Sequence, residues 1–133
     1  MDRAPLTALS SLAKFRRIEL TRLFSIAEWQ DEIPWQPFRE GLEIHRLYGE
    51  VEGGPTAALL RFKEAGEVPL HEHGGYEHIL VLTGSQCDQN SEAAVGTLMI
   101  NPPGTVHRVI AEAGCIVLAI YEKPVRFIAE PPA

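Results

Sequence analysis

The chain has 133 residues, which is enough for one domain with a sizeable hydrophobic core. A formal net charge of −6 and a pI of about 5.3 argue against general binding to nucleic acid or to an anionic membrane. No apolar run approaches the length of a membrane span, and the N-terminus lacks the apolar core of a secretory signal. The two cysteines, Cys87 and Cys115, are therefore expected to be free thiols in a cytoplasmic protein.

Residues 1–28 are expected to form a short N-terminal arm, and residues 29–133 a single domain. Apolar and polar residues alternate over 18–26, which favours the start of a strand that the arm adds to a sheet. Two prolines between residues 29 and 38 argue against a helix or a central strand there. The aromatic side chains of that segment are expected to close one end of a barrel. They are Trp29, Trp35 and Phe38.

After residue 40 the sequence predicts strands only. Short apolar stretches are separated by turn residues such as Gly-Gly-Pro and Pro-Pro-Gly. The expected strands cover residues 42–48, 56–62, 77–83, 97–100, 107–111 and 115–121, with a hairpin region over 84–92. Strands of this length and spacing are typical of a β-sandwich or a barrel, so the fold class is predicted to be all-β.

The stretch from His71 to Glu77 has the composition of a metal site. Residues two apart on a strand point to the same face, so His71 and His73 are expected to point inward together. The glycine pair at 74 and 75 allows a turn or bulge with unusual backbone angles, after which Glu77 faces the same interior. Two imidazoles and a carboxylate suit Fe(II), Mn(II), Ni(II), Cu(II) or Zn(II). The alternative is a surface loop that carries two histidines.

A second stretch, from Gly96 to His107, supplies a fourth candidate ligand. Pro102 and Pro103 lack the backbone donor that a strand ladder needs, so they mark a corner. His107 follows this corner at the start of a short apolar strand.

Together the two stretches resemble the paired motifs of the cupin family. The first motif is matched by Gly66, His71, His73, Glu77 and Gly84, with a spacer of four residues after Gly66 instead of five. The second is matched by Gly96, Pro102, Gly104 and His107, with Ala111 where the family has asparagine. The resemblance covers residues 35–128 and implies a double-stranded β-helix, the cupin jelly-roll barrel. It also implies that one metal ion is bound by His71, His73, Glu77 and His107.

Five other residues are candidates for the cavity wall. These are Tyr48, Arg46, Arg61, Tyr76 and Met99. Either arginine could pair with a carboxylate substrate or be a solvated surface charge. His78 follows Glu77 and is expected on the opposite face of its strand, while His45 is expected to be a packing or rim residue.

Residues 77–85 and 96–105 are most similar to the ChrR-type cupins. That group includes the C-terminal domains of zinc-dependent anti-sigma factors, which carry a helical domain with its own His/Cys zinc site, and single-domain cupins. No such helical domain precedes the barrel, which predicts that the chain does not inhibit a sigma factor directly.

Two functions stay open. The first is a non-heme metal-dependent oxygenase, for example a cupin-type dioxygenase, that acts on a small organic substrate; the second is a non-catalytic module that binds or senses a small ligand through its metal. No general base is evident beside the ligands, which argues against a hydrolase or a sugar epimerase. The expected partner is a small molecule, not nucleic acid or a membrane, and a homodimer is expected on general grounds.

Overall fold

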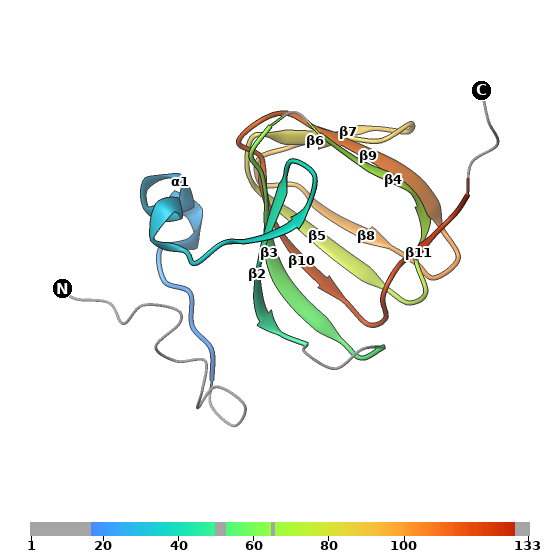
Figure 1. Ribbon diagram of the computed structural model, residues 1–133, viewed down its shortest axis with the longest axis horizontal. Coiled ribbons are helices and arrows are strands. Elements are labelled where there is room, and N and C mark those ends of the chain that lie inside the picture. The colour runs from blue at the N-terminus through green and yellow to red at the C-terminus, as the bar shows by residue number, and fades with distance from the viewer. Residues whose placement is uncertain (1–16, 50–52, 65, 130–133) are drawn as a thin grey trace.

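The computed structural model describes residues 17–49, 53–64 and 66–129, and these form two antiparallel sheets that face each other (Figure 1). The first sheet contains β1 (Gln36–Arg39), β2 (Leu42–Tyr48), β3 (Thr56–Phe62), β10 (Ile116–Tyr121), β5 (Glu77–Thr83) and β8 (Leu98–Asn101), in that order. The second contains β11 (Arg126–Phe127), β4 (Gly66–Glu72), β9 (Val106–Ala111), β6 (Ser85–Cys87) and β7 (Glu92–Ala94). The predicted all-β cupin jelly roll is confirmed.

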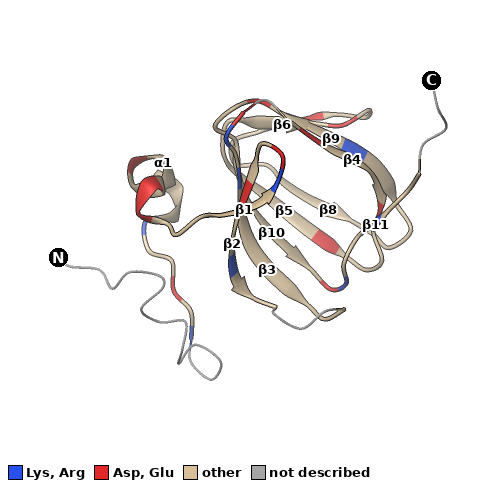
Figure 2. Ribbon diagram, viewed as in Figure 1, with Lys and Arg blue, Asp and Glu red and all other residues tan. Residues whose placement is uncertain are grey.

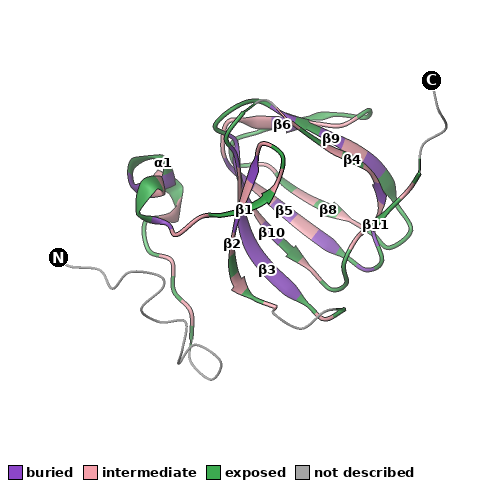
Figure 3. Cartoon of the chain, viewed as in Figure 1, coloured by how far each residue is buried: buried purple, intermediate pink, exposed green. Residues whose placement is uncertain are grey.

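Alternating burial along the strands places one face of each sheet in the interior (Figure 3). On β5, Glu77, Ile79 and Val81 are buried while the residues at 78 and 80 are only partly buried. On β9, His107 and Val109 are buried in the same alternation. Because the period is two, each of these strands contributes both apolar side chains and one of the predicted metal ligands to the same interior.

The strands expected over 42–48, 56–62 and 77–83 have these same bounds in the structure. The strands expected over 97–100, 107–111 and 115–121 are displaced by one residue at one or both ends. Two edge strands, β1 and β11, were not expected, and both are short. The proline in β1 is accommodated because that strand lies at the edge of its sheet.

The strand expected over 18–26 is wrong, because this segment enters a run of helical turns. The turns are η3 (Leu23–Ser25), α1 (Ile26–Trp29) and η4 (Gln30–Glu32). Ile26, Trp29 and Ile33 recur at helical spacing, and all three are buried against the outer face of the first sheet. The boundary between an arm and a domain at residue 28 stays a prediction, and residues 1–16 lie outside the described part of the chain.

The aromatic side chains of residues 29–38 do not close the barrel as a group. Trp29 and Trp35 pack with Leu59, Leu82 and Ile116 on the outside of the first sheet. The Trp29 indole N–H donates to the Arg22 carbonyl and the Trp35 indole N–H to the Gln30 carbonyl, at 2.9 Å in both cases. These two side chains therefore stabilise the helical turns, and Phe38 alone reaches the interior cavity described below.

Acidic and basic side chains of the described residues are interspersed over the strands and turns (Figure 2). Within the same residues, helices of membrane-spanning length and apolarity are absent.

Candidate metal centre

A tight turn between β8 and β9 positions His73. The Thr105 N–H donates to the Pro102 carbonyl at 3.2 Å, and Gly104 has a φ of +87°, as at the third position of a type II turn. The turn then pairs with the chain after β4. The His73 N–H donates to the Thr105 carbonyl at 2.9 Å, and the Gly104 N–H donates to the His73 carbonyl at 2.8 Å. The second motif thus fixes the backbone of a histidine in the first motif.

The same pairing of β4 with β9 brings the other two histidines together, because His71 lies directly opposite His107. The ring centroids of His71 and His73 are 5.1 Å apart, and both rings lie 4.7 Å from that of His107. One nitrogen from each of the three rings lies within 4.8 Å of the others, and all three residues are buried. Residues that are up to 36 positions apart in the chain therefore converge on one point.

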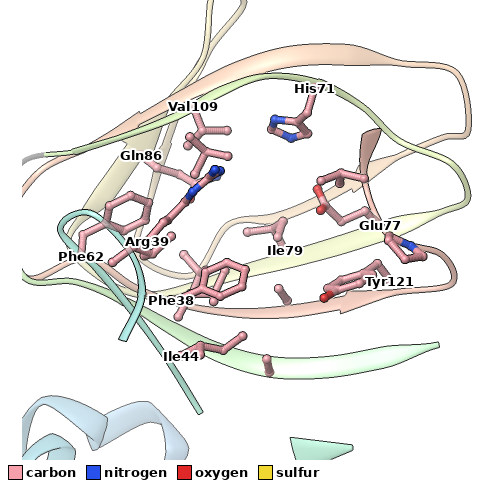
Figure 4. Close-up of a pocket in the computed structure, with 18 of the residues that line it drawn as sticks. Phe38, Arg39, Ile44, Phe62, His71, Glu77, Ile79, Gln86, Val109 and Tyr121 are labelled. Carbon is pink, nitrogen blue, oxygen red and sulfur yellow. The ribbon is translucent and has the colours of Figure 1, made fainter. Parts of the chain in front are cut away.

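Glu77 reaches this cluster from the facing sheet. Its Oε1 lies 3.1 Å from Nε2 of His73 and accepts a hydrogen bond of 3.1 Å from Nδ2 of Asn101. The Glu77 side chain is buried, and Figure 4 shows it pointing into the same interior as His71. The four residues predicted as ligands are thus brought together.

Each histidine is held through Nδ1 by an oxygen acceptor outside the cluster. Nδ1 of His71 lies 2.7 Å from the Pro69 carbonyl, and Nδ1 of His107 lies 3.1 Å from Oδ2 of Asp88. Nδ1 of His73 lies 2.9 Å from Oγ1 of Thr105, whose hydroxyl already donates to Pro102. Because carbonyls and carboxylates only accept, the three Nδ1 atoms must be the donors. In a neutral ring, Nε2 then carries the lone pair and is the atom available to a metal ion.

The hydrogen bonds within the cluster leave one buried nitrogen without a partner, and a metal ion would supply that partner. Nε2 of His73 is buried without a well-aligned hydrogen bond, although Glu77 lies close by. A buried polar atom without a partner costs free energy, and an ion at the centre of the cluster would remove that cost. Three imidazoles and one carboxylate form a donor set suited to iron, manganese, nickel, copper or zinc.

The protonation states also suit metal binding. Burial lowers the pKa of His71, against a hydrogen bond to Pro69 that raises it, and positive charge on His107 lowers it further. Burial alone would raise the pKa of Glu77, but the neighbouring His73 ring and the hydrogen bond from Asn101 outweigh this and lower it. A neutral imidazole at His71 and an ionised carboxylate at Glu77 are the forms that bind a metal.

The glycine pair has a different role from the one expected. Neither Gly74 nor Gly75 has a positive φ, so no unusual backbone angle is needed. A Cβ on Gly75 would lie 3.0 Å from Cβ of Glu122, and a Cβ on Gly74 would lie 3.2 Å from the Pro124 carbonyl. The glycines allow the chain after β10 to pack closely here, and Oε1 of Glu122 accepts a hydrogen bond of 2.7 Å from the Tyr76 N–H.

A cavity of about 260 Å³ adjoins the cluster between the two sheets (Figure 4). His71, Glu77 and His107 form part of its wall. The rest of the wall is mostly aliphatic and aromatic, and its other polar side chains are Arg39, Gln86 and Tyr121. The volume lies just below the range of about 300–1,000 Å³ that is usual for drug-sized ligands, so the cavity suits a smaller organic molecule.

The structure places the five predicted wall residues away from this cavity. Arg61 lies on the outer face of its sheet, over Trp35 at 4.6 Å, and pairs with Glu43 at 2.8 Å. Alternation explains this, because its neighbours on β3 face inward. Tyr48, Tyr76 and Arg46 are exposed, and Met99 packs beside the interior core.

Sequence reasoning missed Arg39 and Gln86. Arg39 lies on β1, where the prolines argue against a helix or a central strand, so no face was assigned to it. Gln86 lies in a segment expected only as a hairpin region. One signal was available in the sequence. If a strand begins at Ser85, alternation directs the Gln86 side chain to the face opposite to that of its two neighbours.

The sequence model of the ChrR cupin-like domain family matches residues 26–125. The chain belongs to this family. Among curated proteins, this ChrR cupin-like chain is 37% identical over 78 residues to the anti-sigma-E factor ChrR of Cereibacter sphaeroides. The match covers 56% of the chain and 37% of that factor, so the chain spans well under half of its length.

Solved structures agree on the cupin-like fold. The ChrR cupin-like chain is similar to a chain in the complex of Rhodobacter sphaeroides SigE with the anti-sigma factor ChrR, with a TM-score of 0.58, 24% identity and coverage of 87% and 75% of the two chains. It is also similar to an acetylacetone dioxygenase from Acinetobacter johnsonii, with a TM-score of 0.67, 14% identity and coverage of 86% and 78%. At these identities the likeness concerns the fold.

Proposed function

We propose that this ChrR cupin-like protein binds one divalent transition-metal ion and uses it to oxygenate a small organic substrate. The ligands are Nε2 of His71, His73 and His107 and a carboxylate oxygen of Glu77. The observation that carries the proposal is the outward hydrogen bond of every Nδ1, which aims three Nε2 lone pairs at one buried point. Such pre-orientation has no use in a cluster that only fills space.

The surroundings of the site favour an oxygenase over other cupin reactions. Apart from the proposed ligands, the described cavity wall contains no Asp, Glu, Lys, His or Cys, and Tyr121 is its one side chain that could move a proton. A hydrolase or an epimerase commonly needs both an acid and a base at the substrate, so a single tyrosine argues against those reactions. An oxygenase needs instead a dry, apolar site, which this wall provides, and a redox-active ion such as iron would supply the dioxygen chemistry that zinc cannot.

The test begins with the metal. The protein, purified without added metal, is analysed for its bound ion, and oxygen uptake is then measured with Fe(II) against small diketones, thiols and aromatic diols. We expect one ion per chain and uptake with at least one substrate class, both lost in His73→Ala. Metal-free protein that binds no added divalent ion would refute the proposal.

The second candidate is a metal-dependent ligand-binding or sensory module. Its support is the 37% identity to an anti-sigma factor, since that relative is named as a regulator. In this case the zinc-loaded protein binds a small ligand tightly and shows no oxygen uptake with any metal. The same two measurements therefore separate the two functions.

A homodimer also stays a prediction. The outer face of the first sheet carries exposed apolar side chains on β8 and β10, the two strands that flank β5, namely Leu98, Ile100 and Ile120. Exposed apolar surface of this kind is common where copies of a chain associate. Light scattering after size-exclusion chromatography, on wild type and on Ile100→Lys, tests it: a monomeric wild type contradicts it.

A further inference from the structure

Gln86 has a buried polar side chain without a hydrogen-bond partner among the described residues. The residue is 6% exposed, and its side chain lines the cavity. Gln86 pairs with Ala111, four residues along β9 from His107, which corresponds to about 13 Å along the strand. A buried amide at this distance from the histidines is available to a ligand that extends away from the metal.

Arg39 supplies a positive charge to the wall of the same cavity. It lies on β1 at the edge of the first sheet, and its guanidinium lies 4.4 Å from the ring centre of Phe127, on β11 at the edge of the second sheet. The Phe127 ring in turn lies 5.9 Å from the His71 ring. Figure 4 shows the Arg39 side chain pointing into the cavity. The Phe127 ring thus lies in contact with the Arg39 guanidinium on one side and near the histidine cluster on the other.

Three other arginines of the barrel already have carboxylate partners, and a fourth, Arg46, is exposed beside the Phe38 ring and is not part of the cavity wall. Arg61 pairs with Glu43, Arg108 with Glu67 and Arg126 with Glu72. Arg39 pairs with no carboxylate in the described residues, and its contact with Phe127 leaves its N–H donors free. Inside an otherwise apolar wall, an arginine with free donors is suited to an anionic group, above all a carboxylate.

We propose that the cavity takes a small organic acid with a compact apolar body. Arg39 binds the carboxylate, and Gln86 donates a hydrogen bond to an oxygen of the ligand. The aliphatic wall holds the body beside the histidine cluster. Arg39 is then the residue that decides between a charged ligand and its neutral analogue. This inference rests on the proposed function in one respect, namely that the cavity ligand lies beside a metal.

The test compares a carboxylate with its neutral isostere. Binding of benzoate and benzamide, and of 4-methylpentanoate and 4-methylpentanamide, is measured by calorimetry on zinc-loaded protein. We expect each acid to bind at least about tenfold more tightly than its amide. Arg39→Gln should abolish that preference, Arg39→Lys should keep part of it, and Gln86→Met should weaken acid binding several-fold. Lys63→Gln, which removes one exposed charge elsewhere, should change nothing.

Two outcomes overturn the inference. One is equal affinity of wild type for acid and amide, and the other is an unchanged preference in Arg39→Gln, which would mean that the metal alone selects the anion. Zinc content is measured in every variant, and the titrations are repeated on metal-free protein. A chain that binds no metal but keeps the Arg39-dependent preference refutes the proposed function and leaves this inference standing.

Discussion

The histidine cluster and the cavity wall differ in whether their polar groups already have protein partners. In the cluster, every Nδ1 is held by an oxygen of the chain, and only the atoms facing the centre are left to a metal. In the wall, Arg39 and Gln86 have no polar partner among the described residues. The cluster therefore suits one small ion at a fixed point, and the wall suits a ligand that brings its own hydrogen-bonding groups.

The largest expected effect is the loss of a ligand at the cluster. His73→Ala should lower metal affinity by more than the roughly 10- to 100-fold that is typical when a residue hydrogen-bonded to a metal ligand is replaced, because it removes a proposed ligand itself. Added zinc should then raise the melting temperature of the wild type and not of the variant, since a metal bound only by the folded state stabilises it. Differential scanning calorimetry with and without zinc measures both.

His78→Ala is the matched control for this comparison. His78 neighbours Glu77 but is paired between Ile120 and Ile100 on the outward-facing side of β5, where alternation directs it away from the cluster. It should keep the full zinc-dependent shift in melting temperature. If His78→Ala and His73→Ala lose the shift equally, the proposed ligand set is wrong.

The next largest effect on metal affinity is expected at Asp88, whose carboxylate accepts the hydrogen bond from Nδ1 of His107. Asp88→Asn places an amide where a carboxylate accepts from Nδ1 of His107, while Oδ1 can still accept from the Asn90 and Ser91 N–H groups. Metal affinity should fall by about 10- to 100-fold. Competition with a coloured chelator measures the affinity. Asp31→Asn, an exposed carboxylate paired with Arg61 on the outside, should leave it unchanged.

Filling the cavity should separate the wall from the cluster. Ala58 on β3 is buried and lines the cavity, so Ala58→Leu adds three carbon atoms to the space that a ligand would take. Binding of benzoate should weaken by more than about tenfold, while zinc content stays at the wild-type value. Ala94→Leu, at an exposed position on β7, is the control. Loss of zinc in Ala58→Leu would show that cluster and wall are not independent.

The same difference explains which parts of the site could be predicted. His71, His73, Glu77 and His107 lie in two short motifs in which a strand, a turn and a fixed spacing determine the direction of each side chain. The strands that carry most of the interior were also predictable, because their apolar runs are bounded by glycine and proline. Local pattern was sufficient in both cases.

The wall depends on information that local pattern lacks. Arg39 reaches the cavity only because β1 and β11 lie at the edges of opposite sheets, and each is too short to show an alternation. The helical turns over 23–32 were missed for a related reason: the spacing of Ile26, Trp29 and Ile33 becomes informative only once a sheet surface is there to bury them. The role of Gly75 was hidden for the same reason: a side chain there would contact Glu122, which lies 47 residues later in the chain.

The smallest expected effect concerns a third kind of buried group, which neither a metal nor a ligand is expected to reach. Burial, and to a lesser extent the negative charge of Glu112, raises the pKa of Cys115 from 9.0 to about 11. The folded state therefore holds the thiol proton more tightly than the unfolded state. The stability that this provides is complete below pH 9 and is lost as the pH rises towards 11. Cys115→Ala should flatten that part of the pH profile of the free energy of unfolding, measured in urea.

In native protein at pH 8, iodoacetamide should modify the partly exposed Cys87 and spare Cys115, because Cys115 is fully buried and stays protonated. Equal modification of both cysteines would mean that the interior beside Cys115 opens readily, and then the apolar wall could not keep water from a bound ligand either.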